Sequence, residues 1–304
     1  MRTSLITLAQ KELRIVGCAN GVAGRVLGCE QAAHVMKESP ILQKSSIRHT
    51  WHNFIQEEPS GRQLNAIEGV EKLCKNLANS IERLVRAQRQ LLIIGGDHSC
   101  AIGTWSGVAK GLQAAGPLGL IWIDAHLDSH TPATSSSSNL HGMPVSHLLG
   151  FGDRRLSDLL GFAPKILPGN LVMIGARCFE PEEQAFLERL NVRIFYMDEV
   201  HRRGISSVLN EAVSIASTNT AGYGISLDID AFRIEDAPAV GTPAEDGLVA
   251  VDFLKALKTV DFRQLVATEV VEFLPDRDDD RQTSERLVVR LIEEIYENKW
   301  KNDE

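Results

Sequence analysis

The stretch LGLIWIDAHLDSH at residues 118–130 decides the fold of this chain. Its opening run LGLIWI is apolar throughout, which is typical of a strand buried on both faces of a parallel sheet. Directly after this run, acidic and histidine side chains occupy every second position: Asp124, His126, Asp128 and His130. Alternate side chains of an extended chain point the same way, so these residues predict one polar face at the carboxyl end of a strand.

Similar apolar runs recur along the chain. They are LRIVG at 13–17, LLIIGG at 91–96, LVMIG at 171–175, VRIFYM at 192–197, YGISLDID at 223–230 and LVATEVVEF at 265–273. Amphipathic segments of helical length lie between them, such as 66–88 before the run at 91–96 and PEEQAFLERL at 181–190. Strands that alternate with helices predict an α/β fold with a mainly parallel central sheet.

Some segments are expected to be irregular. They are GVAGRVLG at 21–28, SIRHTWHNFIQEEPSG at 46–61 and PDRDDDRQTSE at 275–285, the last leading into a closing helix at 286–300. The serine-rich tract TPATSSSSN at 131–139 is flanked by candidate site residues, so we interpret it as a binding loop and not as a linker. We therefore expect residues 1–304 to form a single domain.

Composition narrows the class of protein. A chain of 304 residues with 43% hydrophobic content is long enough for a sizeable core. The net charge of -8, with both signs interspersed, argues against a nucleic-acid or acidic-membrane partner and suits a cationic or neutral ligand. The five cysteines are scattered without a C-x-x-C pair, and neither a leader nor a membrane span is expected. These features predict a cytoplasmic protein.

Polar side chains follow three of the expected strands at the carboxyl end, where parallel α/β sheets bind ligands. They are Asp97 and His98, then Asp124, His126 and Asp128, then Asp228 and Asp230. An aspartate after a single strand more often caps the next helix. Carboxylates that converge from several strands, however, repel one another and lose hydration unless cations neutralise them. A metal site explains all three strand ends together.

The residue types indicate which metal and how many ions. Four aspartates and two histidines, without sulfur, favour Mn²⁺, Mg²⁺ or Fe²⁺ over structural zinc. Six protein ligands exceed what one catalytic ion with an open position uses. The sequence therefore predicts two metal ions that share aspartates and hold a water between them.

The same motifs carry a family resemblance. GGDHSCAIG at 95–103, DAHLD at 124–128 and SLDID at 226–230, in this order, resemble the metal motifs of the ureohydrolases, the family of arginase and agmatinase. The resemblance extends over about residues 90–275. It implies a three-layer α/β/α fold, two Mn²⁺ ions per subunit, hydrolysis of a guanidino group to urea, and a homo-oligomer, either a trimer or a hexamer.

The resemblance also implies a ligand set. One manganese would be bound by His98, Asp124, Asp128 and Asp228, and the other by Asp124, His126, Asp228 and Asp230. A guanidinium carbon is a poor electrophile, so its hydrolysis needs a strong nucleophile. A water that bridges two divalent ions has a pKa low enough to supply hydroxide near neutral pH.

Three residues are expected to act in catalysis. Asp128 would do so beside its role as a ligand. His141 in SSSNLHGMP resembles the proton-shuttling histidine of the arginases and would protonate the departing amine; the alternative is a loop histidine bonded to backbone. Glu272 in TEVVEFLP stands where the family has a glutamate that orients the guanidinium, although a glutamate there would by itself more often be solvated or cap a helix.

Substrate-binding residues follow from the same resemblance. Ser137 and Asn139 match a serine and an asparagine that bind the substrate carboxylate in arginases. Glu180 and Glu183 in GARCFEPEEQ match carboxylates that meet the α-amino group, and Thr242 in GTPAEDGL is assigned to the same site. The prediction is a dimanganese arginase that hydrolyses L-arginine to L-ornithine and urea.

The sequence also departs from the arginase pattern. His130 stands where arginases carry an asparagine that contacts the substrate carboxylate, Glu180 replaces an aspartate, and Leu274 replaces an asparagine of the common E-V-N-P ending. These departures keep a second hypothesis open, a ureohydrolase acting on agmatine or a guanidino acid. A third hypothesis, a non-catalytic relative retained for binding, is disfavoured because all the metal ligands are present. The segment at 17–33 matches the family only loosely and is assigned no role.

Overall fold

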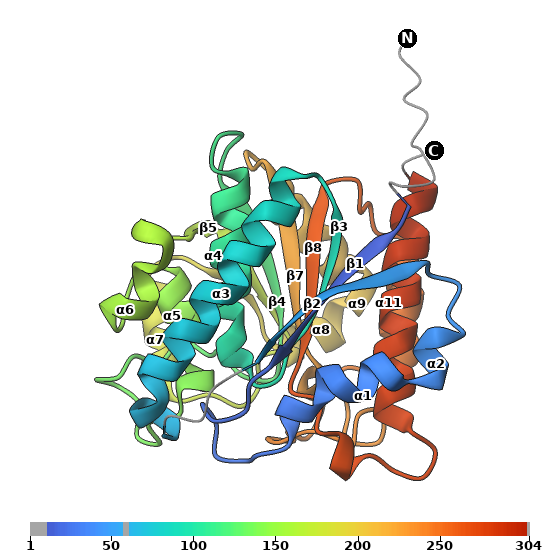
Figure 1. Ribbon diagram of the computed structural model, residues 1–304, viewed down its shortest axis with the longest axis horizontal. Helices are drawn as coiled ribbons and strands as arrows, with labels where there is room; N and C mark the ends of the chain where they lie inside the picture. The colour runs from blue at the N-terminus through green and yellow to red at the C-terminus, as the bar shows by residue number, and fades with distance from the viewer. Residues whose placement is uncertain (1–10, 57–60, 303–304) are drawn as a thin grey trace.

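The computed structural model describes residues 11–56 and 61–302, and its strands form one central sheet (Figure 1). The spatial order is β2-β1-β3-β8-β7-β4-β5-β6, and all neighbours pair in parallel. The strands are β1 Leu13–Ala19, β2 His49–Gln56, β3 Gln90–Ile94, β4 Leu118–Ile123, β5 Ile166–Ile174, β6 Arg193–Phe195, β7 Gly222–Asp228 and β8 Leu265–Val271. Residues 1–10, on which the expectation about a leader depends, lie outside the described residues.

Helices cover both faces of the sheet, as in Figure 1, where α3 and α4 cross in front of it. One core cluster lies under α3 Ile67–Arg86, α4 Ala101–Leu112, α5 Pro144–Leu148, α6 Arg154–Ser157 and α7 Pro181–Arg189. The other lies under α1 Ala32–Glu38, α2 Pro40–Gln43, α8 Met197–Arg203, α9 Ile205–Ser217, α10 Ala250–Leu257 and α11 Thr283–Asn302. The predicted three-layer α/β/α fold is confirmed.

The strands supply both cores by alternation. In β4, Ile121 and Ile123 join the cluster on the α9 side, whereas Leu120 and Trp122 join the cluster on the α4 side. A strand buried on both faces needs apolar residues at nearly every position, which is why these segments appear as continuous apolar runs. No helix within the described ranges is long and apolar enough to cross a membrane.

The prediction that residues 46–61 are irregular is wrong for 49–56, which form β2. β2 lies at the edge of the sheet and pairs only with β1. A strand with one neighbour and a partly exposed face keeps polar residues such as His49, Thr50 and Asn53, so it lacks the apolar run that marks the inner strands.

Candidate metal centre and substrate pocket

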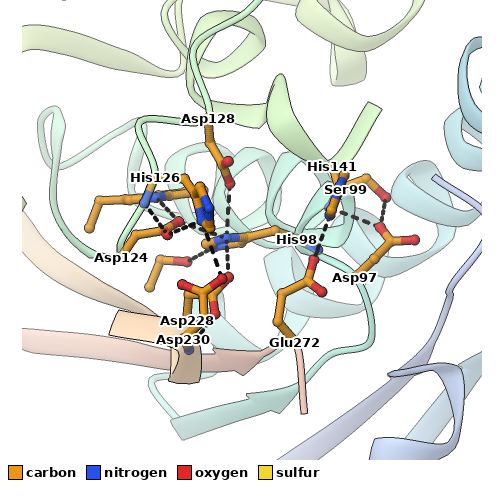
Figure 2. A network of polar contacts seen from close by, with 12 residues as sticks. Asp97, His98, Ser99, Asp124, His126, Asp128, His141, Asp228, Asp230 and Glu272 are labelled. Atoms are coloured by element: carbon orange, nitrogen blue, oxygen red, sulfur yellow. Dashed lines mark hydrogen bonds and ion pairs between the residues drawn. The ribbon is translucent and has the colours of Figure 1, made fainter. Parts of the chain in front are cut away.

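The strand order places the candidate ligands side by side. β3, β8, β7 and β4 are consecutive in the sheet. His98 follows β3, Glu272 follows β8, Asp228 and Asp230 lie at the end of β7, and residues 124–130 form the loop after β4. His98 opens a short 3₁₀ turn after β3, whereas Asp228 ends β7 and Asp230 follows it in another such turn. Figure 2 shows these side chains converging on one region.

His98 faces three carboxylates. Its Nδ1 lies 3.0 Å from Asp128 Oδ2, 3.2 Å from Asp124 Oδ2 and 3.3 Å from Asp228 Oδ2. This nitrogen is buried and makes no well-directed hydrogen bond to any of them. A ring nitrogen aimed at the centre of several carboxylate oxygens is the arrangement that a divalent cation requires, because each atom offers it a lone pair.

A second group of ligands adjoins the first. His126 Nδ1 lies 3.3 Å from Asp124 Oδ1 and 3.2 Å from Asp230 Oδ2. Asp124 therefore presents one oxygen to each histidine, Oδ2 to His98 and Oδ1 to His126. One carboxylate shared between two clusters of donors fits a pair of cations better than a single cation.

The acids of this centre repel one another. Burial and the neighbouring Asp124 raise the pKa of Asp128 to about 6. Burial, together with the charges of Asp230 and Asp124, also raises the pKa of Asp228. The donor set thus fits divalent cations, which would offset both the burial and the mutual repulsion of these carboxylates.

The loop after β4 differs from the extended chain that the alternating pattern suggests. β4 ends at Ile123, and Asp128 has a φ of 48°, in the left-handed region. The premise that Asp124 to His130 form an extended segment is therefore wrong. The side chains of His126, Asp128 and His130 nevertheless line one cavity.

Backbone and aromatic donors hold the ligands in place. Trp122 Nε1 donates to Asp124 Oδ2 at 2.9 Å, and the backbone N–H of His126 donates to Asp124 Oδ1 at 2.7 Å. Arg177 donates to several backbone carbonyls, including those of Asp230 at 2.9 Å and Glu245 at 2.7 Å. Its contacts tie the turn after β7 to a neighbouring loop and make it a structural residue.

His141, which is partly buried, and Glu272, which is buried, form a pair at the rim of the centre. His141 Nδ1 lies 2.9 Å from Glu272 Oε1, which also accepts a hydrogen bond from the backbone N–H of His98 at 2.8 Å. Burial alone would lower the pKa of His141, but the charge and hydrogen bond of Glu272, together with the charges of Asp97 and Asp128, outweigh it and raise that pKa to about 9. Glu272 has a φ of 61°, which turns its side chain off the line of β8.

Asp97, which follows a predicted strand but was assigned no role from the sequence, supports this pair. Asp97 accepts hydrogen bonds from Asn20 Nδ2 at 2.8 Å and from the backbone N–H of Ala23 at 3.0 Å. The carbonyl of Ala23 in turn accepts from the backbone N–H of His141 at 3.4 Å. Asp97 thus ties the loop after β1 to the loop that carries His141. Asp97 was visible in the motif GGDHS, but nothing in the sequence of the loop after β1 indicated that its residues would be the partners of Asp97.

The substrate cavity opens beside the centre and has a volume of about 350 Å³. All six predicted substrate-binding residues line it, together with three candidate ligands and other residues. The lining includes His126, Asp128, His130, Ser137, Asn139, His141, Cys178, Glu180, Glu183, Asp228, Thr242 and Glu272. Thr242 Oγ1 also donates to Asp230 Oδ2 at 2.9 Å, so this residue contacts a candidate ligand directly.

Two ionisable side chains that line the cavity contact each other. His130 Nε2 lies 2.9 Å from Glu180 Oε2. Glu180 is the N-cap residue of α7 and forms a capping box with Glu183. Glu183 accepts from the backbone N–H groups of Ser129 and Glu180, at 3.0 and 3.1 Å, and burial raises its pKa to about 8. Glu183 therefore holds the backbone at Ser129 and Glu180 in place and also lines the cavity.

Comparison with known proteins identifies the family. The model of the Arginase family matches residues 14–297. The chain belongs to the arginase family. It is 32% identical to arginase from Bacillus caldovelox over 95% of this chain and 99% of the relative, and 37% identical to arginase from Brevibacillus brevis over 82% and 81%. The crystal structure of the Bacillus caldovelox enzyme aligns with a TM-score of 0.86 and 31% identity, covering 94% of this chain and 98% of that chain.

These matches extend over the whole fold and confirm the resemblance drawn from three short motifs. The chain is an arginase-type ureohydrolase, a hydrolase of linear amidines from a metal-dependent family. The central parallel sheet flanked by helices is also the fold of the solved arginases.

Proposed function

We propose that this chain is an arginase that hydrolyses L-arginine to L-ornithine and urea with two Mn²⁺ ions per subunit. The observation that carries the proposal is that Asp124 presents one carboxylate oxygen to His98 and the other to His126. Asp128 and Asp228 would complete one ion's ligands around His98, and Asp228 and Asp230 the other's around His126. The relatives named arginase support the choice of arginine.

The cations would supply charge compensation and a water of lowered pKa as the nucleophile. The chain's own residues would orient the substrate and supply the proton. Glu272, held by the His98 backbone, would orient the guanidinium by its negative charge. His141, beside Glu272, would hold a proton at neutral pH and donate it to the departing amine.

The direct test is urea release from L-arginine by protein loaded with Mn²⁺, compared with protein stripped by a chelator. The proposal expects urea only from the loaded protein. An Asp228→Asn variant should remain folded and lose both metal and urea release. A loaded wild-type chain that forms no urea from arginine would contradict the choice of substrate.

The pair His130–Glu180 supports a second candidate, hydrolysis of another guanidino compound. Glu180 is engaged by His130 at 2.9 Å and so is less available to an α-ammonium group. 4-Guanidinobutyrate lacks that group, whereas agmatine keeps an ammonium group and lacks the carboxylate. Comparing kcat/KM for arginine, agmatine and guanidinobutyrate separates the candidates, and His130→Asn should raise the arginine value relative to that of guanidinobutyrate if this pair restricts arginine.

Further properties are part of the proposal. One continuous sheet with a core on each face supports a single domain over 1–304. None of the five cysteines, all of which lie in the described ranges, forms a disulfide, which supports a cytoplasmic location. We also propose a homo-oligomer, a trimer or a hexamer, for which sedimentation of the purified protein is the measurement.

A further inference from the structure

Three residues lie in register across neighbouring strands beneath His98. Trp122 of β4 pairs with Ser226 of β7, which pairs with Glu269 of β8. All of them are fully buried. By strand alternation they share the face covered by α4, since Leu120 and Ala267 belong to that core cluster. These strands therefore present a row of side chains directly under the candidate ligand.

The row contacts His98 on its ring face and at its outer nitrogen. The Trp122 ring stacks on the His98 ring at 4.0 Å between centroids, with 11° between the planes. His98 Nε2 lies 3.0 Å from Ser226 Oγ, and Ser226 Oγ donates to Glu269 Oε2 at 2.7 Å. A chain of hydrogen bonds thus runs from the histidine through the serine to a carboxylate.

Glu269 is itself held rigidly. Trp105 Nε1 donates to Glu269 Oε2 at 3.1 Å, and Cys100 Sγ contacts Oε1 at 3.6 Å. Trp105 approaches the sheet over Gly224, where an added Cβ would lie 2.0 Å from its ring. The groups that donate to Glu269 here are neutral, so no ion pair of its own explains why a carboxylate is placed in the core.

The direction of the hydrogen bonds supplies an explanation. Ser226 Oγ donates its single hydroxyl proton to Glu269 Oε2. Ser226 Oγ then has only lone pairs to offer His98, and Nε2 must carry the ring proton. Nδ1, which faces Asp124, Asp128 and Asp228, is left with its lone pair free for a cation.

We propose that Glu269 is a positioning residue of the metal centre: through Ser226 it fixes the tautomer and orientation of His98 that bind a divalent cation. This inference rests on the proposed metal site and adds a buried carboxylate, outside the predicted ligands, on which metal affinity depends. Outer partners of metal-bound histidines typically contribute about 10- to 100-fold to metal affinity.

The test measures Mn²⁺ affinity by calorimetric titration of the full chain after chelation. In Glu269→Gln the amide NH₂ can donate to Ser226, which lets the serine hydroxyl turn toward Nε2 and favours the wrong tautomer. We expect Mn²⁺ to bind about 10- to 100-fold more weakly. Thr268→Val is the matched control, because Thr268 is a buried neighbour on β8 whose side chain faces the other core, and its affinity should match the wild type.

Ser226→Ala provides a second route if Glu269→Gln does not fold. It breaks the same chain of hydrogen bonds and should weaken Mn²⁺ binding similarly. The double variant should bind about as weakly as either single variant, since both changes interrupt one relay. If the losses of Mn²⁺ affinity in the two single variants multiply in the double variant, the two residues act independently and the proposed relay is wrong.

The outcomes separate this inference from the proposed function. Unchanged Mn²⁺ affinity in both Glu269→Gln and Ser226→Ala, with a wild type that binds Mn²⁺, overturns the role of Glu269 and leaves the metal site standing. A wild-type chain that binds no Mn²⁺ overturns both. A lower melting temperature of the metal-free variants, with unchanged affinity, would show a purely structural carboxylate and also overturns the inference.

Discussion

At the scale of single residues, the site depends on backbone positions that non-glycine residues rarely adopt. Asp128 and Glu272 have φ values of 48° and 61°, and both point into the centre (Figure 2). Such conformations cost about 1–3 kcal/mol each and persist when the surroundings hold them. Here the backbone N–H of Glu272 donates to the Gly96 carbonyl at 2.8 Å, and the Asp128 carbonyl accepts from Val145 at 2.9 Å.

His141→Asn tests the proton donor. His141 is outside the proposed ligand set, so the variant should bind as much Mn²⁺ as the wild type. The value of kcat should fall by about 10²- to 10⁴-fold, the usual contribution of a general acid. Steady-state kinetics and metal analysis of the same sample measure both. A variant that keeps its kcat would remove His141 from the mechanism.

At the scale of elements, the contact between α4 and the sheet depends on Gly224 in β7. A Cβ at this position would lie 2.0 Å from the Trp105 ring. Gly224→Ala should therefore lower the free energy of unfolding by at least about 1–3 kcal/mol, the usual effect of overpacking. Gly169→Ala in β5 is the control, since no atom lies within 4 Å of its added Cβ. Denaturant unfolding of both variants is the measurement, and equal stabilities would contradict this packing.

A second element-scale prediction concerns pH and the segment before β5. Lys165 is buried and donates to the carbonyls of Ser157 and Phe162. Burial lowers its pKa from 10.5 to about 8. Between these values the unfolded chain binds more protons at this lysine, so its contribution to stability rises with pH through that window and is lost as pH falls through about 8.

The comparison that isolates this lysine is Lys165→Met. The free energy of unfolding of the wild type, minus that of the variant, should increase from pH 8 to pH 10. Chemical denaturation at a series of pH values measures it. A difference that stays constant over this range would mean that the pKa of Lys165 is not lowered in the folded protein.

The sequence predicted the inner elements and the candidate ligands because each carries a local signal. Strands such as β4 are apolar at nearly every position, and their polar ends are visible in the chain. β2 lacked that signal because it is an edge strand. Glu269 was passed over because a single acid inside LVATEVVEF does not reveal that its partners are Ser226 and Trp105, which come from other strands and helices. Cross-strand partners in this sheet come from segments that are distant in the chain, so the residues of one strand do not show which side chains it will meet.

At the scale of the whole molecule, the centre joins the carboxyl ends of β3, β4 and β7, so bound cations should stabilise the entire sheet. Chelation should lower the melting temperature, and added Mn²⁺ should restore it in a concentration-dependent way. A ligand at 100 times its Kd stabilises a protein by about 2.7 kcal/mol. Calorimetry with and without chelator measures this, and Mg²⁺ at the same concentration compares a second hard cation. An unchanged melting temperature would argue that the acids are not bound by metal.

The central claim is that two cations held around Asp124 act together on a guanidino substrate. The measurement that tests it most directly is a titration of the metal-free chain with Mn²⁺, in which bound metal and urea release from L-arginine are followed in the same samples. The account predicts saturation at two ions per chain, with urea release rising as both positions fill. Full hydrolysis without metal, or two bound ions with no hydrolysis of any guanidino substrate, would contradict it.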